Sequence, residues 1–334
     1  MFSSTFVKVF YDDAFLDYSH SPGHPESPER LRHTVSELKR LNCDVEFMKP
    51  RAATLSELLA VHSSAYVEGI RKRSVGWVDE ETPVHSQTFD VASLAAGASI
   101  NALETALQTG TTTMALVRPP GHHAGISHGG GFCYFNNVAV AARKANMDRI
   151  AIVDIDVHHG NGTSEIFYNT DKVLYVSTHQ RGIYPGTGKV EEVGKGDGEG
   201  FNLNIPLRAG SGDATFQLAL DSVVIPVLQA YKPRAVLVSL GVDSHYMDPL
   251  ASLLLSTLGY VEVLKRLTEA VKSSALILEG GYNIEAVFDV IQGAIQLVKG
   301  IEHRAQFSHI EDYSAIGRGD VMNALHFSKT FWNI

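Results

Sequence analysis

The stretch at residues 149–162 reads RIAIVDIDVHHGNG and decides the fold. Its apolar part, residues 150–153, is typical of a strand buried on both faces of a parallel sheet. Asp154, Asp156 and His158 follow at every second position, so an extended strand would place them on one face. A surface strand with a polar face is the alternative, but residues 150–153 are too apolar for an edge that faces water. Because buried carboxylates need a cation or hydrogen-bond donors beside them, we predict a central strand that ends in a metal site.

Four further apolar runs resemble residues 149–155 and are read as buried strands: residues 113–117, 172–176, 234–240 and 275–278. Between or after them, apolar residues recur at three- and four-residue spacings that are typical of covering helices: residues 137–147, 214–231, 258–272 and 286–299. Strands that alternate with helices predict an α/β fold, here a three-layer α/β/α sandwich with a mostly parallel sheet. We expect residues 1–334 to form a single domain around that sheet.

The composition is typical of a globular protein with a sizeable core, with 44% hydrophobic and 19% charged residues. A net charge of -9, without a run of lysines and arginines, argues against direct nucleic-acid binding. Two cysteines, Cys43 and Cys133, make a disulfide framework implausible and indicate a reducing compartment. Residues 1–11 lack the pattern of a secretory signal, and no later run is expected to approach membrane-spanning length. We therefore predict a cytoplasmic protein with no membrane contact.

Polar side chains follow each predicted strand, at the sheet edge where ligands bind in such folds. Asp243 follows the strand at residues 234–240 and supplies a third ligand beside Asp156 and His158, which leaves a position open for water. A helix cap is the alternative for Asp243 taken alone. Two carboxylates and one imidazole suit Zn²⁺, although Fe²⁺, Co²⁺ or Mn²⁺ could also bind.

Two histidines and a tyrosine complete the expected site. His122 and His123 follow two prolines and a glycine, so we expect them on a rigid loop, with Asp154 and Asn161 as their partners. A carboxylate raises the pKa of its histidine more than a carboxamide does, so one imidazole could stay charged while the other accepts a proton. Tyr282 follows two glycines, which could let its phenol swing over a bound carbonyl; a packed core tyrosine is the alternative.

Two stretches carry weaker signals. Residues 182–200 are rich in glycine, but their spacing does not fit a phosphate-binding loop, so we expect a mobile or turn-rich loop near the site. Residues 301–334 give no signal that we can interpret. Cys133 has no base placed beside it by any local pattern, and we expect a buried thiol.

The motifs RPPGHHA (118–124), GFCYFNN (131–137), DIDVHHGNG (154–162), GVD (241–243) and LEGGYN (278–283) together resemble the histone deacetylase family, over residues 11–300. The resemblance implies the arginase-like α/β fold and a zinc-dependent amidohydrolase. Asn161, Glu279 and the segment HPESPER at residues 24–30 are similar to the class II and prokaryotic branch, which includes acetylpolyamine amidohydrolases.

The resemblance also implies roles for individual residues. It implies metal ligation by Asp156, His158 and Asp243, with His122, His123, Tyr282, Asp154 and Asn161 acting around the metal. It implies a substrate tunnel formed by Gly131, Phe132 and Tyr184, with Leu250 at its mouth. It further implies a monovalent cation, K⁺ or Na⁺, near Asp154, Asp156, His158, Ser177 and Thr178, and a second one near Phe167, Thr170, Val173 and Phe201.

Our functional hypothesis is the hydrolysis of acetyl or other short acyl groups from lysine side chains or similar amines. An acidic residue at position 250 would favour cationic polyamines, and Leu250 therefore favours uncharged acyl-lysine substrates. The acidic residues 79–81 keep an acetylpolyamine deacetylase as an alternative. A ureohydrolase with two manganese ions would need further bridging ligands. A catalytically weak acyl-lysine-binding protein would not need the metal ligands, the histidine pair and Tyr282 together.

Overall fold

Eight parallel strands form one sheet in the computed structural model, which describes residues 6–73, 75–308 and 316–334. The strand order is β2-β1-β5-β10-β9-β6-β7-β8. The strands are β1 (Val7–Phe10), β2 (Val45–Met48), β5 (Thr112–Ala115), β6 (Ile150–Asp154), β7 (Val173–Gln180), β8 (Asn202–Leu207), β9 (Ala235–Leu240) and β10 (Ser274–Leu278). A separate antiparallel hairpin joins β3 (Gly76–Trp77) and β4 (Pro83–Val84).

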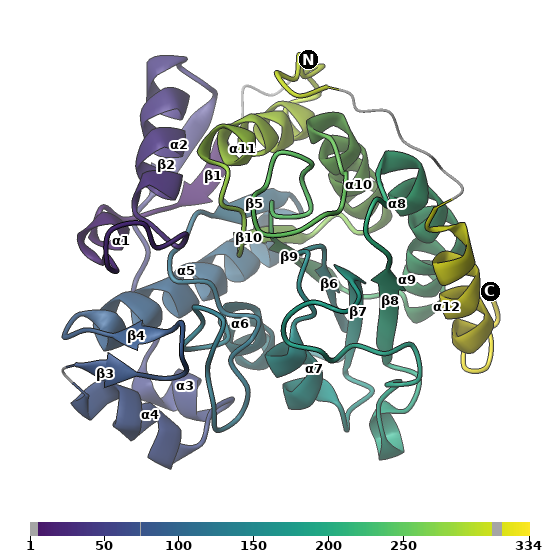
Figure 1. Ribbon diagram of the computed structural model, residues 1–334, viewed down its shortest axis with the longest axis horizontal. Helices are drawn as coiled ribbons and strands as arrows, with labels where there is room; N and C mark the ends of the chain where they lie inside the picture. Colours follow the sequence, from purple (N-terminus) through teal and green to yellow (C-terminus); the bar gives the residue numbers. More distant parts are fainter. Residues whose placement is uncertain (1–5, 74, 309–315) are drawn as a thin grey trace.

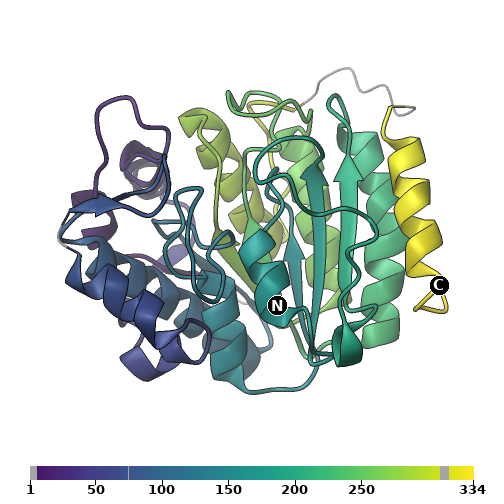
Figure 2. The ribbon, with the colours of Figure 1, turned by 60° about the horizontal axis from the view of Figure 1, so that its bottom comes forward.

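Helices cover both faces of the sheet, as Figure 1 shows, and Figure 2 gives the same layers from a second direction. One face carries α2 (Glu29–Arg40), α8 (Asp213–Ala219), α9 (Ile225–Tyr231), α10 (Thr257–Ala270), α11 (Ile284–Val298) and α12 (Arg318–Ser328). The other face carries α5 (Thr88–Thr109), α6 (Asn137–Ala145) and α7 (Asn161–Phe167), with α3 (Leu55–Leu59) and α4 (Ser64–Lys72) beside them. The predicted three-layer α/β/α sandwich is thereby confirmed.

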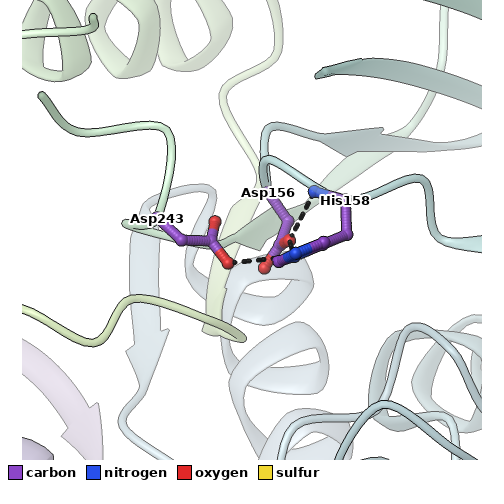
Figure 3. Close-up of side chains that lie close together, drawn as sticks. All are labelled: Asp156, His158 and Asp243. Atoms are coloured by element: carbon purple, nitrogen blue, oxygen red, sulfur yellow. Dashed lines mark hydrogen bonds and ion pairs between the residues drawn. The ribbon is translucent and has the colours of Figure 1, made fainter. Parts of the chain in front are cut away.

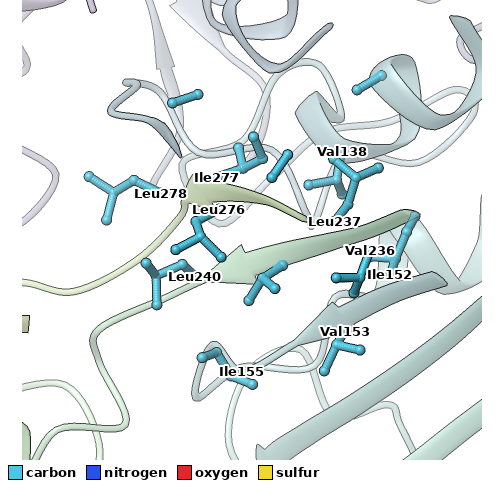
Figure 4. Close-up of a cluster of buried hydrophobic side chains, with 14 of the residues drawn as sticks. Val138, Ile152, Val153, Ile155, Val236, Leu237, Leu240, Leu276, Ile277 and Leu278 are labelled. Atoms are coloured by element: carbon cyan, nitrogen blue, oxygen red, sulfur yellow. The ribbon is translucent and has the colours of Figure 1, made fainter. Parts of the chain in front are cut away.

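The central strands are buried on both faces because their side chains are apolar throughout. All residues of β6, β9 and β10 are buried, and side chains such as Ile152, Leu237 and Leu276 pack together between the helix layers (Figure 4). Asn136 caps α6 and Asn283 caps α11. In each case the side-chain oxygen accepts a hydrogen bond from the main-chain N–H of the third residue along the helix. These two helices therefore begin directly after loops at the carboxyl edge of the sheet.

Strand β6 ends at Asp154, earlier than an extended run through His158 would require. The Asp156 N–H donates to Asp154 Oδ1 at 3.2 Å, and the His158 N–H donates to Asp156 Oδ1 at 2.9 Å. These local bonds accompany the end of the strand, although Ile155 N–H still donates to Ser239 O of β9 and Gln180 N–H of β7 donates to Val157 O. The expectation of one extended strand through His158 was therefore wrong, whereas Ile155 and Val157 are buried as expected.

Several elements left no readable pattern in the sequence. The outer strands β1, β2 and β8, the 22-residue helix α5 and helix α12 were not predicted. Helix α5 packs against α6 and against strands of the sheet, which α6 also contacts at β9. Gly97 on α5 is so close to the chain of residues 51–53 that a Cβ would meet Arg51 O at 1.9 Å. Helix α12 packs beside β8, so residues 318–328 contribute to the fold.

The helical run Asp213–Tyr231 is long and apolar enough to cross a membrane by length and composition, with a mean hydropathy of 1.2 over its 19 residues. The expectation that no run reaches this length was wrong. The run is 56% buried within the protein, and a core helix passes the same test, so it is weak evidence for a span. Residues 1–5 of the N-terminal stretch considered for a signal lie outside the described residues.

A buried ion network joins the N-terminal segment to the catalytic edge. Glu26 accepts hydrogen bonds from Arg118 at 2.8 Å and from Arg30 at 3.2 Å, and all three side chains are fully buried. Burial opposes the charge of Glu26, but Arg118, His20 and Arg30 outweigh it and lower the pKa of Glu26 far below its usual range. The network thus links residues 24–30 to the loop that carries His122.

We predict that Glu26→Gln lowers the free energy of unfolding at pH 7 by about 3–5 kcal/mol, because two buried guanidinium groups lose their counter-charge. Since the folded pKa is lowered, the carboxylate stabilises the protein above its unfolded pKa of about 4.3, and this stabilisation is lost as the pH falls further. Urea unfolding at pH 7 and pH 3 measures both effects. The solvent-accessible pair Glu37–Arg40 gives a control, Glu37→Gln, which should change little; equal effects of the two variants would contradict the account.

Candidate active site

Asp156, His158 and Asp243 converge at the carboxyl edge of the sheet, beyond β6 and β9 (Figure 3). His158 Nδ1 lies 3.1 Å from Asp156 Oδ1 and 3.3 Å from Asp243 Oδ2. One potential ligand atom from each residue lies within 4.8 Å of the others. Both carboxylates are buried, so their charges face each other with little water between them.

The surroundings of the three side chains fit a divalent cation. Asp243 Oδ2 is buried and has no hydrogen-bond partner, while Asp243 Oδ1 accepts the Val157 N–H at 2.8 Å. Asp156 Oδ2 accepts the Gly280 N–H at 2.9 Å. A Cβ on Gly280 would lie 2.2 Å from Asp243 Oδ2, so only glycine lets the chain approach the carboxylates this closely. A cation bound by oxygen and nitrogen atoms would satisfy the orphaned oxygen and offset both charges.

The two histidines on the loop after β5 have different partners. His122 Nδ1 lies 3.1 Å from Asp154 Oδ2, and its Nε2 lies 3.7 Å from Asp156 Oδ1. Burial acts to lower the pKa of His122, but the charges of Asp156 and Asp154 outweigh it and raise that pKa to about 10. The Tyr175 hydroxyl also donates to Asp154 Oδ2, at 3.0 Å, which favours the charged carboxylate.

His123 is held in the opposite state. Its Nδ1–H donates to Asn161 Oδ1 at 2.7 Å, which leaves Nε2 free to accept a proton. Burial lowers the pKa of His123 well below its usual range, and the neighbouring His122 and His158 lower it further. The pair thus offers one charged donor and one neutral acceptor, the contrast expected from a carboxylate and a carboxamide partner.

Tyr282 lies on the opposite side of the site, after β10. Its ring meets Phe132 edge to face at 5.8 Å, and the Arg30 guanidinium lies 5.1 Å from the ring centre. Arg30 also donates to Gly281 O at 2.6 Å and to Glu279 O at 2.5 Å, and the Tyr282 N–H donates to Asp248 Oδ2. The main chain is held on both sides by these bonds, and the movement of the phenol expected from the two glycines stays a prediction.

Aromatic and apolar side chains surround the approach to these residues. His123 meets Tyr184 edge to face at 4.9 Å, and a Cβ on Gly131 would lie 2.8 Å from the Tyr184 ring. Tyr184 and Leu250 are 44% and 43% exposed, whereas Phe132 is buried. Gly131 and Tyr184 therefore lie beside His123, and Phe132 lies beside Tyr282, whereas the place of Leu250 at the mouth and the tunnel itself stay predictions.

Two weaker expectations concern neighbouring residues. Residues 182–200 form a turn-rich loop beside the site, in which Gly188 O accepts a bond from His179. Cys133 is a buried thiol, and burial raises its pKa well above the usual range.

The residues of the first predicted monovalent-cation site are neighbours, because β6 and β7 pair Asp154 with Ser177, and Thr178 donates to Asp154 O. Those of the second gather around the start of β7, where the Thr170 N–H donates to Phe167 O and the Tyr175 N–H to Phe201 O. Val173 opens the same strand. The cations themselves stay predictions.

Comparison with known proteins identifies the family. The model of the histone deacetylase domain matches residues 24–298. The chain belongs to the histone deacetylase family. A probable deacetylase from Archaeoglobus fulgidus is 40% identical over 292 residues, which cover 83% of this chain and 81% of that protein. Chloroplastic histone deacetylase 14 from Arabidopsis thaliana is 36% identical and covers 86% of this chain and 77% of its own length.

The solved structures agree with this assignment. The crystal structure of the HDA15 HD domain superimposes with a TM-score of 0.91 at 32% identity, covering 99% of this chain and 96% of that one. Membership of the histone deacetylase family supports a hydrolase with deacetylase activity.

Glu279 has a role that sequence reasoning missed. Its Oε2 accepts the N–H groups of Gly121 and His122, at 2.6 and 3.2 Å, so it fixes the loop of the histidine pair. Burial raises the pKa of Glu279 to about 7. A carboxylate placed directly after the apolar run at residues 275–278 was the available signal.

We predict that Asp243→Ala weakens zinc binding by more than about 100-fold, beyond the effect typical of an outer-shell partner. Chelation should lower the melting temperature of the wild-type protein and leave that of the variant unchanged, because the ion stabilises only a protein that binds it. Affinity should fall at acid pH, since the ligands must lose their protons. Metal analysis after dialysis measures this, with the exposed Asp197→Ala as control. Equal zinc content in both variants would rule out Asp243 as a ligand.

Proposed function

We propose that this protein is a zinc-dependent amidohydrolase that removes acetyl or other short acyl groups from lysine side chains or similar amines. One observation carries the proposal. A buried set of two carboxylates and an imidazole, with one orphaned oxygen, lies beside a charged and a neutral histidine. Metal-assisted hydrolysis of an amide combines a Lewis acid with proton transfer, and this arrangement would hold the metal and supplies the proton acceptor.

Asp156, His158 and Asp243 would hold the metal. A bound Zn²⁺ supplies Lewis acidity, which polarises a carbonyl and lowers the pKa of water. Such an ion suits two oxygen ligands and one nitrogen ligand, although Fe²⁺, Co²⁺ or Mn²⁺ would also fit.

The chain's own residues move the protons. His123 Nε2 accepts a proton from the attacking water, because Asn161 holds its Nδ1–H and the ring is neutral. The Tyr282 hydroxyl donates to the carbonyl oxygen as negative charge develops on it. His122, kept charged by Asp154 and Asp156, stabilises that charge, and a protonated imidazole then gives a proton to the leaving amine.

An acetylpolyamine deacetylase is the second candidate. Its support is electrostatic, because Asp79 accepts the Gly131 N–H at 3.0 Å and so places a carboxylate beside the predicted tunnel. Burial raises the pKa of Tyr184 most, and the charges of Asp79 and Glu81 raise it further. A cationic substrate would be drawn to this side of the mouth. The apolar and exposed Leu250 favours the acyl-lysine substrate instead.

The two remaining alternatives, a ureohydrolase and an acyl-lysine-binding protein, fit the site less well. Within residues 6–73, 75–308 and 316–334, a single cluster has the geometry for a metal, whereas a ureohydrolase needs two bridged ions. A binding protein would not require a proton acceptor such as His123. The cytoplasmic location and the K⁺ or Na⁺ sites are part of the proposal.

Replacing Tyr282 by Phe removes the donor to the carbonyl oxygen. We expect kcat for an acetyl-lysine peptide to fall by about 10²–10³, with zinc content unchanged. Tyr246→Phe removes a hydroxyl from the nearby residue that stacks on His245 and should leave kcat unchanged. A near-normal rate in Tyr282→Phe would refute the role of the phenol.

The substrate class is tested by comparing kcat/KM for an acetyl-lysine peptide and for N-acetylated polyamines. We expect the wild-type protein to prefer the peptide. Leu250→Glu should raise kcat/KM for the polyamines by up to roughly fivefold, as an exposed ion pair would, and salt should weaken the gain. A wild-type preference for polyamines would overturn our interpretation of Leu250, and hydrolysis of neither substrate would favour the binding protein.

A further inference from the structure

Asp248 lies in the loop between β9 and α10, which also carries Asp243, and the residue is 7% exposed. Its Oδ2 accepts the Tyr282 N–H at 2.6 Å and the Asn283 N–H at 3.3 Å. Its Oδ1 accepts the Leu250 N–H at 3.0 Å. One carboxylate therefore connects the residue at the mouth of the site with the tyrosine beside the metal ligands.

Asn283 makes a second contact between the same two loops. Asn283 Nδ2 donates to Met247 O at 3.1 Å, and Asn283 Oδ1 caps α11 by accepting the Ala286 N–H at 3.0 Å. Arg30 holds the same segment from the other side, through Gly281 O. The main chain of Tyr282 is thus fixed relative to helix α11. Asp248 is the side chain that connects the loop of Leu250 to the main chain of Tyr282.

The charge of Asp248 is costly, which argues for a role beyond packing. In the part of the chain that the structure describes, no lysine, arginine or histidine forms an ion pair with it, and three main-chain N–H groups are its partners. Burial and the charge of Asp243 raise the pKa of Asp248 to about 7, although those three bonds act to lower it. A buried carboxylate without a counter-ion contributes little to stability.

We infer that Asp248 is a positioning residue, which holds the Tyr282 phenol and the Leu250 side chain in fixed relation across the mouth of the site. The inference rests on the proposed function, since the phenol matters only if an amide is hydrolysed. A catalytic group misplaced by about 1 Å can lose on the order of 10²-fold in rate, so main-chain bonds of this kind can set the rate.

Asp248→Asn tests the role with little change of shape. A carboxamide keeps one acceptor oxygen and turns an NH₂ group toward N–H donors, so it cannot serve Leu250 and Tyr282 together. We expect kcat to fall by about 10–100-fold, with KM and zinc content nearly unchanged. The matched control is Asp213→Asn, because Asp213 likewise accepts a main-chain N–H, from Ser256 in the same loop, and does not bond to Tyr282.

A double-mutant cycle separates positioning from general damage. If Asp248 acts through the phenol, adding Asp248→Asn to the Tyr282→Phe variant should cost less than about twofold more in kcat. Independent, multiplied effects of the two substitutions would overturn the inference.

Hydrogen exchange gives a readout that does not need turnover. In Asp248→Asn, peptides that contain residues 279–286 and 247–252 should exchange faster, whereas β6 and β9 should not. Unchanged exchange in both peptides would overturn the inference even if the wild-type protein shows no hydrolysis. Absence of wild-type hydrolysis with faster exchange would instead refute the proposed function and leave the positioning contact established.

Discussion

Two buried carboxylates, Asp156 and Asp243, meet at the end of the central strands, and Asp243 Oδ2 has no hydrogen-bond partner and only His158 Nδ1, at 3.3 Å, as a neighbouring cationic group among the described residues. Carboxylates this close repel each other and lose their hydration, so the folded chain needs positive charge between them. His158 provides part of it, and a divalent cation would provide the rest. Glycines at positions 241 and 280 allow this crowding, because a Cβ at either would lie within 2.2 Å of a carboxylate oxygen.

Buried carboxylates also hold the loops around this centre. Glu279 binds the main chain of His122, and Asp248 binds that of Tyr282. Glu26 pairs with Arg118, which lies on the loop of the histidine pair, and with Arg30 of α2, which donates to Gly281 O in the loop of Tyr282. Each loop that carries a proposed catalytic side chain is therefore fixed by a charged group inside the protein. Rigid loops on a parallel sheet suit a reaction in which hydrogen-bond donors must already be positioned where negative charge develops in the transition state.

The sequence predicted the central strands and the helices whose apolar residues recur at regular spacings. It also predicted the polar residues that directly follow an apolar strand. Asp156, His158 and Asp243 were found because parallel strands bring their carboxyl ends to one edge. Short strands such as β2 were missed, since three half-buried residues and one exposed residue carry little pattern. Helix α5 was missed because it is buried on several sides, which removes the one-sided apolar stripe of a surface helix. The contacts of Asp248 and Arg30 with the loop of Tyr282 were missed because their partners are main-chain groups. Every residue type has such groups, so the sequence gives no pattern for these contacts.

The central claim is that amide hydrolysis depends on one metal ion held by Asp156, His158 and Asp243. Its most direct test is to measure turnover of an acetyl-lysine peptide against bound zinc, on protein that has been stripped and then reloaded in steps. The account predicts no turnover without metal and a rate that rises in proportion to occupancy, up to one ion per chain. Hydrolysis by the stripped protein, or a rate that rises only after a second ion binds, would contradict it.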